Sequence, residues 1–226
     1  MISYLPISDL GDPVAIKLVL YMLAISLSNQ LCGINALLTY ADLILEEAGV
    51  PLQSQLAGLT IFLLMLVSTL LSTPLIRKVN RRPLLATSLG LCSLSLACLG
   101  TYFHLCSETE PSSLHPSSNS VSLVPLICLL VYIISFSLGM GPLCFILLSD
   151  FSLPRLAALA GTATGLTMWI SCGLVTYAFP LLEVELGRPA VFWGFALCSA
   201  AGSAFALFVL PETRGRSGAE VEAAMQ

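Results

Sequence analysis

The sequence predicts an all-α membrane protein that crosses the bilayer six times. Of its 226 residues, 57% are hydrophobic and only 10% are charged, and the mean hydropathy is +0.93. A soluble domain carries about a quarter charged residues, so this chain lacks the charges to cover a water-facing surface. A helical crossing needs about 20 apolar residues. Apolar runs of this length occupy residues 14–40, 56–76, 84–103, 123–148, 157–179 and 190–210.

The first run begins after Asp12 and Pro13, a capping carboxylate followed by proline at the first helical position. Polar residues recur in this run at helical spacing. Asn29 lies on the polar face, Gln30 lies at its edge, and Asn35 joins them only if the helix unwinds near Gly33. Amides at this depth need partners or water. Two interpretations stay open: the amides bind a hydroxyl-rich ligand, or they hydrogen-bond to neighbouring helices.

Basic residues follow the second run, at Arg77, Lys78, Arg81 and Arg82. Each would cost roughly 2.5–3.5 kcal/mol at the bilayer centre, so this connection lies outside the hydrocarbon. Of the nine Lys and Arg residues, all except Arg188 fall at the same set of alternate helix ends. The positive-inside rule therefore predicts that both termini are cytoplasmic. Residues 1–13 and 211–226 are expected to be cytoplasmic segments that flank a bundle at 14–210.

The third and fourth runs are separated by residues 104–122, which contain seven serines and two prolines and predict a flexible loop that includes His104. The fourth run carries Gly139, Gly141 and Pro142, which break or kink a helix. Backbone groups freed in this way are tolerated beside protein or a water-filled cavity, and the glycines equally suit close helix packing. In the fifth run, Trp169 suits a sugar face or ordinary packing.

Several function classes are excluded by composition and motif. The net charge is −4 and the basic residues form no strip along which a nucleic acid could bind. No metal-binding or nucleotide-binding motif occurs, so we expect no enzyme, cofactor or metal. The eight cysteines lie mainly in apolar runs and are interpreted as small buried hydrophobes.

Five segments together resemble one known family. Residues 29–36 read Asn-Gln-Leu-Cys-Gly-Ile-Asn-Ala and are followed by Tyr40, which is similar to the segment that opens the second half of sugar porters, the facilitative glucose-transporter branch of the major facilitator superfamily. Residues 77–83, 139–142, 154–155 and 211–215 are similar to later motifs of that family, in the same order. The resemblance covers nearly the whole chain, but only the carboxy-terminal six-helix half of the family. It implies half of that fold, built as two inverted three-helix units.

The resemblance also implies roles for individual residues. Those expected to contact sugar are Gln30, Asn35, Asn29, Phe136, Phe145 and Trp169. Those matching the family's charge cluster, thought to latch the outward-facing state, are Arg81, Arg82, Asp150, Arg155, Glu212 and Arg214. Met65, Ser137 and Cys172 depart from the family, because each stands where a more polar or charged residue is usual.

The function implied by the resemblance is transport of a hexose or related sugar by alternating access. The partners expected are the sugar, the lipid bilayer and a second six-helix half, on the same or another chain, and the location expected is the plasma membrane. The alternative is a non-transporting fragment or paralogue that associates with a full-length transporter and regulates it.

Overall fold

The computed structural model describes residues 13–47, 54–109, 123–152 and 157–215, and within these ranges it contains helices and no strand. Six of its segments are long and apolar enough to span a membrane, as the sequence predicts. The helices are α1 (Pro13–Leu31), α2 (Ile34–Glu47), α3 (Ser54–Lys78), α4 (Arg81–Thr109), α5 (Leu123–Leu138), α6 (Met140–Phe151), α7 (Ala157–Leu186) and α8 (Arg188–Phe208).

Two of the six spans are each made of two helices. The first consists of α1 and α2, which are interrupted around Gly33, and the fourth consists of α5 and α6, which are interrupted at Gly139. The other four spans are single helices. Both interruptions lie where the sequence placed glycines inside apolar runs.

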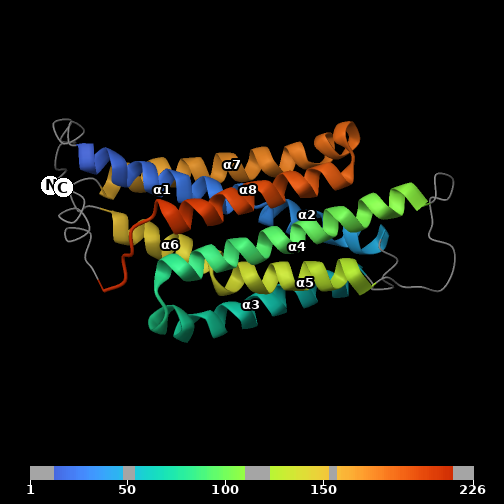
Figure 1. The fold of residues 1–226 in the computed structure, drawn as a ribbon, viewed down its shortest axis with the longest axis horizontal. Helices are drawn as coiled ribbons and strands as arrows, with labels where there is room; N and C mark the ends of the chain where they lie inside the picture. The colour runs from blue at the N-terminus through green and yellow to red at the C-terminus, as the bar shows by residue number, and fades with distance from the viewer. Residues whose placement is uncertain (1–12, 48–53, 110–122, 153–156, 216–226) are drawn as a thin grey trace.

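The helices lie side by side along the long axis of the molecule, and α1 begins at the same end at which α8 finishes (Figure 1). Helix α4 packs mainly on α8 and α5, α1 packs on α7, and α3 packs on α5. In Figure 1, α7 and α3 form the two outer margins of the bundle. We call the end that carries Lys78, Arg81 and Arg214 the basic end.

Burial differs sharply between the spans. In the most apolar window of each helix, 56% of the residues of α4 are buried, but only 17% of those of α3 and 6% of those of α7. Large apolar side chains such as Leu70, Leu71 and Leu174 are exposed on these two helices. Helices α3 and α7 therefore present apolar faces that no other described residue covers. Lipid or another protein would cover these faces in a membrane.

The expected loop at 104–122 is wrong at its start. Helix α4 continues to Thr109, so His104 lies in a helix, and its ring packs against that of Trp193 with 5.3 Å between centroids. The apolar run ends near Phe103, but a helical backbone continues beyond the hydrocarbon-length segment as long as its hydrogen bonds are kept. Residues 110–122 lie outside the described ranges.

Candidate functional site

The first helix interruption is held by contacts from two other helices. Gly33 adopts a φ of +84°, and a Cβ there would lie 2.9 Å from the ring of Phe195 on α8. A glycine is required on both grounds. The hydroxyl of Tyr132 on α5 donates a hydrogen bond of 3.0 Å to the carbonyl of Cys32. Helix α2 therefore restarts in a fixed direction, which places Asn35 beside the amides of α1.

The second interruption is bridged by one serine. The amide of Gly139 bonds the carbonyl of Phe136 instead of that of Ser135, four residues back. The Ser88 hydroxyl on α4 donates to the freed carbonyl of Ser135 at 2.7 Å and accepts from the amide of Met140 at 2.9 Å. A Cβ on Gly139 would lie 2.3 Å from that of Ser88, so glycine permits this approach.

A cavity of about 340 Å³ opens beside both interruptions. It is bordered by α1, α2, α3, α5, α6 and α7, while α4 and α8 contribute no lining residue. Its lining residues are Asn29, Gln30, Ile34, Asn35, Leu38, Met65, Thr69, Phe136, Ser137, Gly141, Pro142, Phe145, Met168, Trp169 and Cys172. None of these carries a formal charge.

Three amide side chains form a connected chain along one wall of the cavity. Asn35 donates from Nδ2 to Oε1 of Gln30, and Gln30 donates from Nε2 to Oδ1 of Asn29 at 3.3 Å. Asn29 and Gln30 are almost fully buried, whereas Asn35 is partly exposed. These hydrogen bonds depend on the helix interruption, because Asn35 would point away from Gln30 and Asn29 on an unbroken helix. The unwinding on which the sequence argument depended is thus present.

The lining also includes aromatic and sulfur-containing side chains. Trp169 and Phe145 expose 77% and 61% of their surface, whereas Phe136 is buried. Met65 and Met168 also line the cavity. Rings with this exposure can stack on an apolar ligand face.

All six residues expected to contact sugar line this one cavity, together with Gly141 and Pro142. Their role in binding stays a prediction. Gly139 lies at the interruption but not in the lining. Tyr40, which follows the motif at residues 29–36, instead stacks on Phe179, with 5.0 Å between the ring centroids.

Four of the lining residues were not predicted from the sequence: Ile34, Leu38, Thr69 and Met168. Thr69 stands four positions after Met65 and therefore shares its helix face. That spacing is a signal that could have identified it.

A polar cluster joins the ends of four segments at the basic end. Arg81 forms a salt bridge with Asp150, and the Thr213 hydroxyl donates to the same carboxylate at 2.8 Å. Glu212 accepts the backbone amides of Arg81 at 3.0 Å and Arg82 at 3.2 Å, so it caps the N-terminus of α4.

Two further bonds extend this cluster. The Arg214 side chain donates to Oδ1 of Asn80 at 3.3 Å, and the Arg82 side chain donates to the carbonyl of Leu207. Five of the six residues expected in the charge cluster thus lie together. Arg155 lies outside the described residues.

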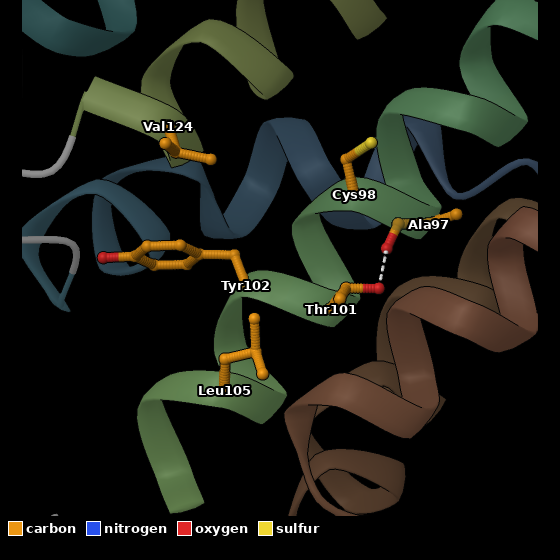
Figure 2. A pocket seen from close by; sticks show the side chains of 6 residues that line it. All are labelled: Ala97, Cys98, Thr101, Tyr102, Leu105 and Val124. Atoms are coloured by element: carbon orange, nitrogen blue, oxygen red, sulfur yellow. Dashed lines mark hydrogen bonds between the residues drawn. The ribbon is translucent and has the colours of Figure 1, made fainter. Parts of the chain in front are cut away.

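A second hollow, of about 370 Å³, lies between α4 and α5 (Figure 2). It is lined by Ala97, Cys98, Thr101, Tyr102, Leu105 and Val124, none of which is a candidate site residue. The Thr101 hydroxyl is directed to the carbonyl of Ala97 on its own helix, at 2.8 Å (Figure 2). This hollow therefore offers few polar groups to a ligand.

Comparison with known proteins gives consistent matches. A family model described as Sugar (and other) transporter matches residues 12–225. The facilitated trehalose transporter Tret1 of Bombyx mori is 31% identical over 205 residues, which cover 90% of this chain and 39% of the relative. A Tret1-2 homolog of Drosophila simulans is 30% identical over 197 residues, which cover 87% of this chain and 39% of the relative.

Among solved structures, the inward-open conformation of the xylose transporter XylE from E. coli matches with a TM-score of 0.78 at 21% identity. The match covers 96% of this chain and 44% of that one. The chain therefore spans less than half the length of each of these proteins.

Proposed function

Because the chain belongs to the Sugar (and other) transporter family and has the fold of one six-helix half of the major facilitator superfamily, we propose that it serves transport of a hexose or related sugar. The sugar binds in the cavity lined by the amides of α1 and α2 and by the exposed rings of Phe145 and Trp169. Alternating exposure of this cavity to the two sides of the membrane moves the sugar without chemical change.

The observation that carries this proposal is the chain of amides from Asn35 through Gln30 to Asn29 in an otherwise largely apolar cavity. Amides both donate and accept hydrogen bonds, which suits a ligand with hydroxyl groups. Polar groups held at membrane depth are unfavourable unless they have partners or water. The position of both helix interruptions beside the same cavity supports a substrate path, because non-helical backbone is tolerated where it lines a cavity.

A second six-helix half is the proposed partner. Only 17% of the α3 window and 6% of the α7 window is buried, and α3 and α7 border the cavity through Met65 and Trp169. A bundle that packed on both helices would cover their exposed faces and close the cavity. The family match supports transport and gives no support to the regulatory alternative.

The proposed orientation places the basic end in the cytoplasm of a plasma-membrane protein. At the opposite end, Arg188 forms a salt bridge with Glu183 and lies over the ring of Phe103, 5.3 Å from its centroid. A single arginine at this end does not reverse the bias of Lys and Arg residues toward the other set of helix ends. The cluster around Arg81, Asp150 and Glu212 is proposed to latch one state, because it ties the ends of α4 and α6 to the segment after α8.

Uptake into liposomes tests the proposal. The purified chain is reconstituted alone or with the amino-terminal half of a related trehalose transporter, and uptake of labelled glucose and trehalose is measured. We expect saturable uptake with both halves and none with the chain alone. Asn35→Ala removes a side-chain amide that hydrogen-bonds the substrate, so it should reduce uptake by about 10-fold or more. Ser203→Ala on α8, outside the cavity, should leave uptake unchanged. Equal uptake by both variants would refute the assigned site.

A further inference from the structure

The basic end carries cations that its acidic residues do not neutralise. Asp150 and Glu212 are the only acidic residues that the described part of the chain places at this end. Asp150 forms its salt bridge with Arg81. Glu212 accepts the backbone amides of Arg81 and Arg82, and also that of Arg214 at 3.1 Å. Both carboxylates are therefore already engaged.

Three basic side chains remain together at the end of α3. Arg77 and Lys78 form the last turn of this helix, are exposed, and make no salt bridge with a described residue. Arg214 is held beside them, because its guanidinium donates to the carbonyl of Arg77 at 2.9 Å and to Oδ1 of Asn80 at 3.3 Å. A guanidinium carries further N–H donors, so Arg214 can still bind an anion. We call Arg77, Lys78 and Arg214 the cation patch.

An exposed apolar stripe of α3 leads directly to the cation patch. Leu63, Val67, Leu70 and Pro74 recur at intervals of three or four residues and are all exposed, and Arg77 follows three residues later. This spacing places them on one face of the helix. Helix α3 lies at a margin of the bundle (Figure 1), so the stripe runs along the outside of the molecule from membrane depth to the basic end.

The stripe faces away from the sugar cavity. Met65 and Thr69, which line the cavity, each stand two positions after a stripe residue, and two positions correspond to about 200° around a helix. Ser72 and Ile76 continue the cavity side of α3 and are buried. A second half that closes the cavity packs beside Met65 and Thr69, so the stripe on the opposite side stays available to lipid.

We propose that the end of α3 binds an anionic phospholipid. The phosphate of the headgroup lies among Arg77, Lys78 and Arg214, and an acyl chain runs along the stripe that ends at Pro74. Basic clusters beside a membrane helix attract anionic headgroups, and exposed apolar side chains favour contact with hydrocarbon over water. A phospholipid joins both groups in one molecule, whereas a free phosphate would leave the stripe unused. This site is independent of the sugar cavity.

Native mass spectrometry tests the proposal by counting the lipids that stay bound to the purified full-length chain. The chain is released from neutral detergent that contains equal amounts of phosphatidylglycerol and phosphatidylcholine with the same acyl chains, so that the two lipids differ in headgroup charge. Glycerol 3-phosphate, which has the phosphate but no acyl chain, is then added as a competitor.

We expect the chain to retain phosphatidylglycerol over phosphatidylcholine by about 10-fold or more. Each basic residue near an anionic headgroup strengthens the attraction by about fivefold, so Arg77→Gln should lower the preference by about that factor. This variant keeps the backbone carbonyl that Arg214 binds. Lys17→Gln is the matched control: it removes an equal charge from an exposed residue of α1, which lies across the bundle from α3 (Figure 1), and it should leave the preference unchanged.

Three results would overturn the proposal. Equal retention of the two lipids would show that the patch does not select an anionic headgroup, and an equal loss in Lys17→Gln would show that only the overall charge matters. Displacement of phosphatidylglycerol by an equal concentration of glycerol 3-phosphate would identify a site for soluble phosphate instead of lipid. The proposed function would stand in each case, because none of these measurements involves the sugar cavity.

Discussion

Replacing Ser88 with alanine removes both hydrogen bonds that bridge the interruption between α5 and α6. The Ser135 carbonyl loses its donor at 2.7 Å, and the Met140 amide loses its acceptor at 2.9 Å. Ser88 and Met140 are buried, so water cannot readily replace the hydroxyl. Within the helix, the Phe136 carbonyl, four residues before Met140, already accepts the amide of Gly139.

The expected loss of stability follows from these two groups. Each buried group left unpaired costs about 1–3 kcal/mol, whereas hydrogen bonds measured in one membrane protein average about 0.6 kcal/mol because the unfolded chain also finds partners. We therefore expect Ser88→Ala to lower the free energy of unfolding by about 2–4 kcal/mol. Unfolding in mixed detergent micelles, followed by circular dichroism, measures this difference.

Ser93 provides the matched control on the same helix. Its hydroxyl donates one bond of 2.8 Å to the carbonyl of Ala196, inside the uninterrupted helix α8. Ser93→Ala should therefore lose less than about 1 kcal/mol. Hydrogen exchange at the Met140 amide gives a second readout, because its protection should fall only in Ser88→Ala. Equal losses in the two variants, with unchanged exchange at Met140, would refute the bridging role of Ser88.

Three further substitutions test other contacts, with stability measured in the same way. Glu212→Gln removes the charge that caps α4 and should cost about 1–2 kcal/mol, whereas an unchanged midpoint would contradict the capping role. Tyr132→Phe removes the hydroxyl that donates to Cys32 and should cost about 1–3 kcal/mol, with faster hydrogen exchange in Ile34–Leu37; unchanged exchange would count against it. Gly33→Ala places a Cβ at a residue with positive φ and against the ring of Phe195, so it should lower the free energy of unfolding by more than about 2 kcal/mol. Gly173→Ala, in open space on α7, should be neutral or stabilising.

The six spans and the places where two of them break could be predicted because both leave local signals. The length of an apolar run matches the thickness of the bilayer core, so each run predicts one span. Glycine or proline inside such a run predicts a break or kink in the helix. Helix ends were less accurate: the apolar run stops near Phe103, whereas α4 continues to Thr109. Composition reports the hydrocarbon boundary, not where the last backbone hydrogen bond forms.

The contacts that fix the site were beyond the sequence argument because they join residues far apart in the chain. Ser88 lies 47 residues from Ser135, and Tyr132 lies 100 residues from Cys32. Nothing in the local pattern distinguishes Ser88 from the other serines of α4. Asn35 was predicted only conditionally, since its membership depended on the unwinding at Gly33.

The helices that border the cavity are largely distinct from those that hold the bundle together. Helices α4 and α8 share the most extensive contact among the described elements and contribute no cavity residue. A cavity side chain such as Met65 or Trp169 can therefore be substituted without removing a contact between α4 and α8. Substitutions among the cavity residues can therefore alter ligand recognition while the packing of α4 on α8 is kept.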